Sequence, residues 1–269
     1  MPLAPFAPSQ DLLGQDEPAP VEICHAQGGA PVLLTCDHAS NAIPSALAGL
    51  GLGPGEVAQH IGWDIGAAAV TRLLAPRLDG PAVLSGYSRL VIDCNRDPGD
   101  PSSIPAASDG VDIPGNRGIS KRARAQRRAA CFDPFHAAIQ ARLETLLAAR
   151  IVPALISIHS FTPVMNGVAR PWHVGILWDR DGRIPLPLLE ALRDDVGITV
   201  GDNEPYSARE PAGYTVRHHA AARGLPHVAV ELRQDLIASE AGAAAWAGRL
   251  AAALRPILAR REIYRVKRH

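Results

Sequence analysis

Short apolar runs alternate along the chain with longer segments whose apolar positions recur at helical spacing. Several of the runs are apolar throughout, as strands buried on both faces are. Strands are predicted at residues 32–36, 82–85, 90–94, 154–161, 173–178, 198–200 and 227–232. Helices are predicted over about residues 60–78, 132–150, 185–196, 211–223 and 238–260. This alternation predicts a three-layer α/β/α fold with a mixed, mostly parallel sheet.

The first 20 residues differ from the rest of the chain. They contain five prolines and no apolar period, which predicts a flexible N-terminal arm before a single α/β domain over residues 21–269. Residues 99–118 are rich in Pro, Gly, Ser and Asp. Because this segment is too long for a plain connection, it is predicted to be a binding loop or lid.

Charge and cysteine usage narrow the classes of partner. Lysine and arginine together number 27, as do aspartate and glutamate, so no global field attracts nucleic acid or an anionic membrane. A small molecule is therefore the expected partner. The cysteines form no C-x-x-C motif and are expected to be reduced thiols of a cytoplasmic protein. No signal peptide or membrane-spanning run is recognisable, and the oligomeric state stays open.

Two of the predicted strands end in histidine. His38 follows the run 32–36, and His159 lies near the end of the run 154–161. In open α/β sheets, ligands bind at the carboxyl ends of the strands. Taken alone, either histidine is as readily explained as a hydrogen-bonded loop residue as it is as a metal ligand. Two histidines at equivalent strand ends favour one shared metal ion, and zinc is the expected metal because imidazole is a common zinc ligand.

Other strand ends carry charged or amide groups. Glu231 interrupts the last apolar run, where a carboxylate needs a partner, a proton or water. It either pairs with Arg233 or another core arginine, or takes a proton from a water activated by the metal. Arg89, Asn95 and Arg96 flank another predicted strand. Arginine recognises carboxylates in bidentate geometry, so these residues are candidates for binding an anionic ligand.

Some charged residues have a simpler structural explanation. Asp64, in the first turn of a predicted helix, would complement the helix dipole. The basic cluster from Arg117 to Arg128 is explained by a solvated helix face, although Arg117, at its loop end, would suit an anionic ligand. His218 and His219, adjacent on a helix, diverge by about 100° and make a poor chelate.

Five runs together resemble one known family. CDHASNAIP, YSRLVIDCNRDP, SIHSF, GDNEPYS and VELRQDL resemble segments of the N-formylglutamate amidohydrolase family, which is similar in turn to zinc carboxypeptidases and aspartoacylase. The resemblance spans about residues 30–240, and the runs keep the family's order. It implies a zinc-carboxypeptidase-like fold.

The resemblance also implies roles for individual residues. His38 and His159 correspond to the histidines that bind Zn²⁺, and Arg89 to the arginine that polarises the scissile carbonyl. The pair Asn95–Arg96 corresponds to the carboxylate-binding pair, and Glu231 to the general base.

One position departs from the wider group. Three residues after His38 stands Asn41, where the group has Glu, and a neutral amide is a weak zinc ligand. Asp64 is the preferred substitute as the third ligand, and Asn41 is the second choice. Asp37 is expected to orient a histidine rather than to bind the metal.

The implied reaction is hydrolysis of N-formyl-L-glutamate to formate and L-glutamate, a step of histidine degradation. Water attacks the acyl carbon, and charged groups stabilise the oxyanion. This small substrate carries a second carboxylate, for which Arg117, Arg170 and Arg233 are candidates, and Tyr206 would hydrogen-bond to it. Two alternatives stay open: a deacylase for another N-acyl amino acid or short peptide, and a non-catalytic carboxylate-binding protein on the same fold.

Overall fold

The protein is known from a computed structural model that describes residues 12–210 and 213–268. The predicted N-terminal arm lies outside the described residues over positions 1–11. The strands of the central sheet are β1 (Val21–Cys24), β2 (Val32–Cys36), β3 (Ala82–Ser85), β6 (Ala154–Phe161), β9 (Val174–Leu177), β10 (Val200–Asp202) and β11 (His227–Arg233). Two small hairpins are β4 (Ala107–Ser108) with β5 (Val111–Asp112), and β7 (Val164–Met165) with β8 (Val168–Ala169).

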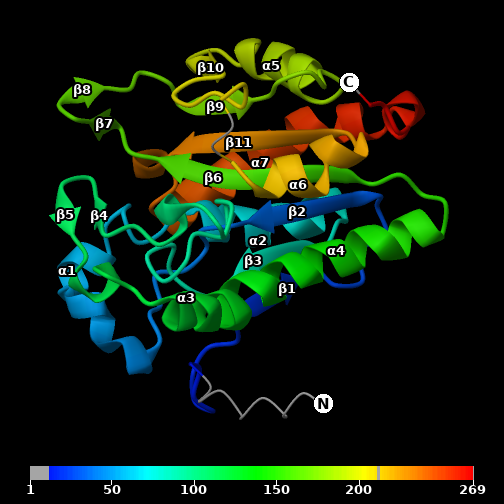
Figure 1. Cartoon of the computed structure of the whole chain (residues 1–269). Coiled ribbons are helices and arrows are strands. Elements are labelled where there is room, and N and C mark those ends of the chain that lie inside the picture. The colour runs from blue at the N-terminus through cyan, green and yellow to red at the C-terminus, as the bar shows by residue number, and fades with distance from the viewer. Residues whose placement is uncertain (1–11, 211–212, 269) are drawn as a thin grey trace, which may run out of the picture.

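The seven strands lie in the order β1-β3-β2-β6-β11-β9-β10 (Figure 1). Strands β3, β2, β6 and β11 are parallel to one another, and β10 is parallel to β9. The antiparallel pairs are β1 with β3 and β9 with β11. The carboxyl ends of β2, β3, β6 and β11 therefore meet at one edge of the sheet.

Helices cover both faces of the sheet. On one face lie α2 (Ala67–Leu78), α5 (Pro185–Arg193) and α7 (Glu240–Leu258), and on the other α4 (Asp133–Ala148) and the short α6 (Thr215–His219) (Figure 1). Two further helices, α1 (Pro54–Val57) and α3 (Lys121–Arg127), belong to the connections between strands. The predicted three-layer α/β/α class is confirmed. Among the described helices, none has the length and apolar character that a bilayer crossing needs.

Strand β6 is buried on both faces and forms a rigid centre of the sheet. Alternation sends Ile156 into the core under α2 and α7, and Leu155 into the core under α4. Helix α4 contributes to the second core a stripe with four-residue spacing, Phe135, Ile139 and Leu143. Each such side chain stabilises the fold by roughly 1.5–3 kcal/mol when fully buried. Packing on both faces thus fixes the strand that carries His159.

The structure corrects two of the predicted elements and adds others. Residues 90–94 form turns rather than a strand, because Asp93 accepts a hydrogen bond from the backbone N–H of Asn95 at 2.7 Å, a local bond that replaces strand pairing. The helix predicted from residue 60 begins only at Ala67, after a turn that carries Asp64. Strand β1 is an addition to the predicted set, and the predicted binding loop 99–118 contains the β4–β5 hairpin.

Two buried histidines join α4 to α6 behind the carboxyl edge. His136 Nε2 lies 2.9 Å from the carbonyl oxygen of Cys94, and His136 Nδ1 lies 2.9 Å from His219 Nε2. A carbonyl only accepts, so His136 Nε2 carries the proton and His136 Nδ1 accepts the proton of His219 Nε2. Burial lowers the pKa of His136 to about 4 and the pKa of His219 to about 3. The pair is neutral at neutral pH.

This pair is expected to make the fold acid-sensitive. Unfolded histidines titrate near pH 6.5, so below that pH the unfolded chain binds protons that the folded pair does not. The contribution of the two histidines to the free energy of unfolding is fully present above about pH 6.5. As the pH falls from there to about pH 4, the free energy of unfolding decreases by up to about 2.7 kcal/mol per pH unit. Urea titrations with chelator present, from about pH 7.5 to 5.5, measure it. A His136→Leu, His219→Leu double variant should show a shallower dependence, and equal slopes for both proteins would contradict the assignment.

Candidate active site

The carboxyl edge of the sheet collects polar side chains from separate segments of the chain. His38 follows β2, and His159 and Glu231 lie side by side on β6 and β11, in register across the parallel pair. Asp64 reaches the same place from the turn before α2. All four side chains are buried. The strand ends that carry histidine therefore converge on one point.

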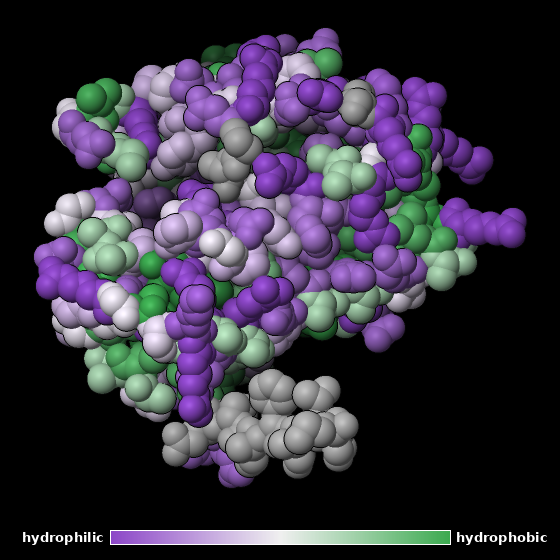
Figure 2. Space-filling model, viewed as in Figure 1, coloured by the Kyte–Doolittle hydropathy of each residue, from purple (hydrophilic) through white to green (hydrophobic). Residues whose placement is uncertain are grey.

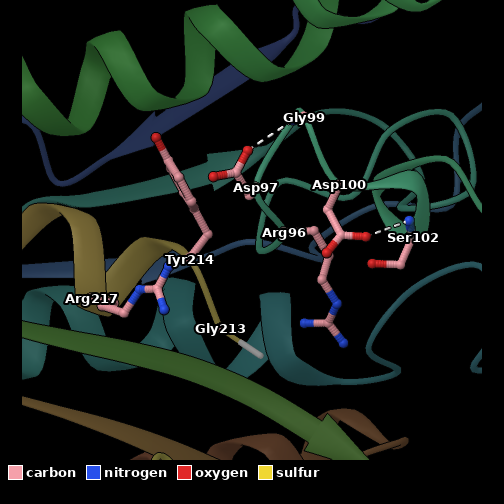
Figure 3. A pocket seen from close by; sticks show the side chains of 8 residues that line it. All are labelled: Arg96, Asp97, Gly99, Asp100, Ser102, Gly213, Tyr214 and Arg217. Carbon is pink, nitrogen blue, oxygen red and sulfur yellow. Dashed lines mark hydrogen bonds between the residues drawn. The ribbon is translucent and has the colours of Figure 1, made fainter. Parts of the chain in front are cut away.

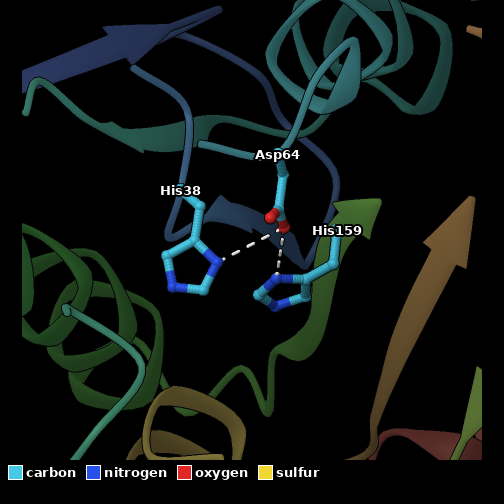
Figure 4. Close-up of side chains that lie close together, drawn as sticks. All are labelled: His38, Asp64 and His159. Atoms are coloured by element: carbon cyan, nitrogen blue, oxygen red, sulfur yellow. Dashed lines mark hydrogen bonds and ion pairs between the residues drawn. The ribbon is translucent and has the colours of Figure 1, made fainter. Parts of the chain in front are cut away.

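His38, Asp64 and His159 form a compact group (Figure 4). Oδ2 of Asp64 lies 3.3 Å from Nδ1 of His38 and 3.1 Å from Nδ1 of His159. The backbone N–H of Ser160 donates to the same oxygen at 3.2 Å and helps to hold it between the rings. One ligand atom from each of the three residues lies within 4.8 Å of the others. Two imidazole nitrogens and one carboxylate oxygen are a donor set that can bind a metal ion.

Each histidine is backed by a second carboxylate. His38 Nε2 lies 2.7 Å from Asp93 Oδ1, and His159 Nε2 lies 3.1 Å from Asp37 Oδ2. A neutral imidazole that donates from Nε2 has its lone pair on Nδ1. Both rings thus turn the nitrogen that can bind a metal toward Asp64, and their orientation is fixed from behind.

The two backing carboxylates differ in how the sequence indicated them. Asp37, expected to orient a histidine, accepts hydrogen bonds from the hydroxyls of Ser157 and Thr215 as well. The sequence pattern does not single out Asp93, because Asp93 lies in an apolar run that predicts a strand. The signal that singled out Glu231, a carboxylate inside an apolar run, would have found Asp93 too.

The charges of the group fit a divalent cation. With both imidazoles neutral, the contacting carboxylates of Asp37, Asp64 and Asp93 outnumber the guanidinium of Arg89 by two negative charges. Burial opposes ionisation, but contact with His38 and His159 in their protonated forms holds the pKa of Asp64 well below its usual range, so the carboxylate stays charged when a proton stands in place of the cation. Oδ1 of Asp64 is buried and has no hydrogen-bond partner among the described residues. The other oxygen, Oδ2, lies between the two ring nitrogens, where a bound cation would satisfy the carboxylate.

Glu231 is suited to proton transfer. Burial, and then the negative charge of Asp64, raise the pKa of Glu231 to about 7 against the opposing effect of His159. Its Oε2 is buried and, within the described part of the chain, has no hydrogen-bond partner. The sequence left open a pair between Glu231 and Arg233. Instead, Arg233 pairs with Asp235 at 2.8 Å. A carboxylate that titrates near neutral pH can both accept and return a proton.

Arg89, Asn95 and Arg96 lie at the same site. Arg89 lies 3.1 Å from Asp93 and 3.5 Å from Asp64, so two ion pairs hold its guanidinium beside the His–Asp–His group. The side-chain oxygen of Asn95 accepts hydrogen bonds from the backbone N–H groups of Tyr214 and Thr215 at 2.8 and 3.0 Å, which ties α6 to the site. Because the side-chain oxygen of Asn95 already accepts these bonds, its amide NH₂ is the group that can donate a hydrogen bond to a ligand.

A cavity of about 730 Å³ opens over this edge of the sheet. His38, Asp64, His159 and Glu231 line it, and its mouth includes residues of the β4–β5 and β7–β8 hairpins, between which the surface is hollowed (Figure 2). The volume is in the range of small-molecule sites. The buried group therefore faces a space that a small substrate can enter.

The sequence between residues 30 and 238 matches a known family model, that of N-formylglutamate amidohydrolase. The chain belongs to the N-formylglutamate amidohydrolase family. The resemblance expected from the five sequence runs is confirmed. As a member of this family the protein is a hydrolase that acts on an amide, which excludes the non-catalytic alternative.

Solved structures resemble this amidohydrolase over most of its length. A gene product of Agrobacterium tumefaciens is 38% identical, with a TM-score of 0.88, and the match covers 92% of this chain and 98% of that one. An N-formylglutamate amidohydrolase from Ralstonia eutropha is 20% identical, with a TM-score of 0.64, over 89% and 97% of the two chains. At that identity the second likeness shows the fold. No curated protein matches the chain.

The other predicted ligand residues of this family member lie in different places. Tyr206 lines the cavity and accepts a hydrogen bond from Arg170 at 3.1 Å, whereas Arg170 is not among the residues found to line the cavity. Arg117 pairs with Asp112 on the exposed β4–β5 hairpin, and Asn41 does not line the cavity either. Asp64 occupies the place between the histidines for which Asn41 was the second choice. The proposed roles of Arg117, Arg170, Tyr206 and Asn41 stay predictions.

Proposed function

We propose that the protein hydrolyses the N-acyl amide of an acidic amino acid, with N-formyl-L-glutamate as substrate, and that it uses a zinc ion. His38, Asp64 and His159 would hold the zinc, as their donor atoms and the net negative charge around them favour. The observation that carries the proposal is the placement of this group beside the buried carboxylate of Glu231 at the floor of a cavity. A bound zinc ion supplies Lewis acidity, lowering the pKa of water and polarising the substrate carbonyl.

The residues of the chain perform the remaining steps. Oε2 of Glu231 accepts a proton from the attacking water, and the same oxygen then donates that proton to the departing amine nitrogen. The guanidinium of Arg89, held in place by Asp64 and Asp93, stabilises the negative charge that develops on the carbonyl oxygen. The walls of the cavity keep bulk water from these charges, which strengthens the interaction.

Binding of the amino acid requires cationic and amide donors. The NH₂ group of Asn95 and the guanidinium of Arg96 offer bidentate recognition of the α-carboxylate. For the second carboxylate, Arg217 is better placed than Arg117, Arg170 or Arg233, because Arg217 lines the cavity. Figure 3 shows Arg96 and Arg217 on either side of Gly213, where a second, polar hollow adjoins the cavity.

Removal of metal is expected to abolish hydrolysis of N-formyl-L-glutamate. The purified protein is dialysed against a chelator, and release of formate is measured before dialysis, after it, and after addition of zinc. Activity should fall at least about 100-fold and return with zinc, since the proposed mechanism needs an ion at the His–Asp–His group. Full activity in the metal-free protein would refute zinc dependence. Hydrolysis of other N-acyl amino acids without any release of formate would refute the proposed substrate.

A further inference from the structure

The cavity extends beyond the reacting groups along strand β11. Glu231, Ala229 and His227 occupy alternate positions on one face of this strand, and all three line the cavity. Alternate residues of a strand lie on one face about 6.7 Å apart, so the cavity follows the strand for about 13 Å from Glu231 to His227. We name this extension the β11 groove. Ala229 is partly exposed between Val228 and Val230, both fully buried, because its methyl group forms the floor of the groove.

The groove exists because the layer of helices on this face is incomplete. Helix α4 packs on β1, β2 and β3 and reaches Leu155 near the start of β6, whereas the described helix that contacts both β6 and β11 on this face is the short α6. Val216 of α6 and Ala221 just after it form one wall. Leu177 and Trp178, at the end of β9, form the other. The indole N–H of Trp178 donates to Asp202 at 2.7 Å, which holds this wall in place.

The cavity is larger than N-formylglutamate needs. That substrate has about 12 non-hydrogen atoms, and even at the roughly 30 Å³ that each water occupies in the liquid it would fill about 360 Å³. The cavity measures about 730 Å³. About half of the space therefore remains for a part of the substrate that a formyl group does not supply.

The two ends of the cavity differ in character. Arg89 and Arg96 lie at the end near the His–Asp–His group and suit the carboxylates of the amino acid. The side walls of the β11 groove are apolar, His227 forms its far end, and the carboxylates of Asp179 and Glu204 lie at the rim of the cavity. Apolar walls beside carboxylates disfavour an anionic occupant. The amino-acid half of the substrate thus belongs at the arginine end, and the acyl half is the one that can extend into the groove.

We propose that the β11 groove is a subsite for an uncharged acyl group several carbons long, so that this amidohydrolase accepts N-acyl amino acids with acyl groups larger than formyl. The proposal rests on the proposed amide hydrolysis beside Glu231 and extends it to the substrate class. Leu177, Trp178 and Val216 contact the chain, and the small side chain of Ala229 leaves room for it.

The test is a series of L-glutamates acylated with formyl, acetyl, butanoyl and hexanoyl groups. Burial of each methylene in an apolar groove should raise kcat/KM about fourfold until the groove is filled. Formyl hydrolysis together with a steady fall of kcat/KM as the chain lengthens would overturn this inference and leave the proposed function intact. No hydrolysis of any member of the series would instead reject the proposed function.

Filling the groove supplies a matched control. Ala229→Leu should remove the gain from longer acyl groups and leave kcat/KM for the formyl substrate within about threefold, because the added carbons occupy the groove and do not reach Glu231. Ala221→Leu, on the exposed wall, tests the same prediction if Ala229→Leu fails to fold. An unchanged chain-length dependence in a folded variant would show that acyl groups do not bind in the groove.

The charge of the occupant is tested with an isosteric pair. N-(4-methylpentanoyl)-L-glutamate and L-leucyl-L-glutamate differ only in an ammonium group next to the scissile carbonyl. A higher kcat/KM for the uncharged compound is expected, because apolar walls desolvate the ammonium group. Preference for the dipeptide would overturn the assignment of an uncharged occupant and would indicate a peptide substrate.

Discussion

Replacement of Glu231 by glutamine is expected to lower kcat for N-formyl-L-glutamate by roughly 10²–10⁴-fold and to leave zinc content unchanged. Glutamine keeps the shape of the side chain but cannot accept a proton. The carboxylate stands beside His159 in the neighbouring strand, and its pKa of about 7 suits it to accept and return a proton near neutral pH. Turnover and zinc per chain are measured on the same preparations.

A matched variant separates the loss of the base from a general change in charge. Glu210 is an exposed carboxylate on the rim of the same cavity, and Glu210→Gln removes one negative charge without touching the buried group. Its kcat should stay within about twofold of that of the natural protein, since an exposed charge is screened by solvent. If Glu231→Gln turned over as fast as Glu210→Gln, Glu231 would have no part in the proton transfer.

Replacement of His159 by alanine is expected to lower zinc affinity by more than about 100-fold and to abolish turnover. Loss of a group that only orients a ligand already costs about 10–100-fold in metal affinity, and here the ligand itself is lost. The variant also leaves the buried carboxylates of Asp37 and Asp64 without their shared partner, so a loss of roughly 3–5 kcal/mol in stability accompanies it. Zinc titration and urea unfolding measure the two effects separately.

Ser157→Ala is the control for that change. Ser157 lies on the same strand, donates to Asp37 at 3.0 Å and has its hydroxyl oxygen 2.9 Å from His159 Nε2, so its loss disturbs the groups behind His159 while both histidines remain. Zinc content should stay near one ion per chain in this variant. Full zinc occupancy in His159→Ala would show that the metal is held by other residues.

Much of the fold was predictable because periodicity is local. The apolar runs around residues 32–36, 154–161 and 227–232 form the central parallel strands. A strand that is buried on both faces is apolar throughout, and this pattern is visible in the sequence whatever the position of the strand in the sheet. The run at residues 90–94 was misread for the same reason: it is buried but folds as turns. The apolar residues of this run correctly indicated that it is buried. Its backbone conformation, however, was decided by hydrogen bonds from side chains to the backbone.

Arginine roles were the least predictable part of the site. Arg117, Arg170 and Arg217 look alike in sequence, yet the first pairs with Asp112, the second donates to Tyr206, and the third lines the cavity. A guanidinium group lies at the end of a long flexible side chain, so its partner depends on what the fold brings within reach.

The sequence by itself determined the alternating α/β architecture and the placing of His38, His159 and Glu231 at strand ends, because these follow from local apolar periodicity. Only the tertiary structure decided that Asp64, 26 positions from His38, stands between the two imidazoles, and that Asp93, 55 positions from His38, orients its ring. It alone also decided that the β11 groove stays open, since covering a sheet face depends on how far a helix reaches across it. Which groups form ion pairs and hydrogen bonds depends on their distance in the folded protein, and the sequence pattern does not give that distance.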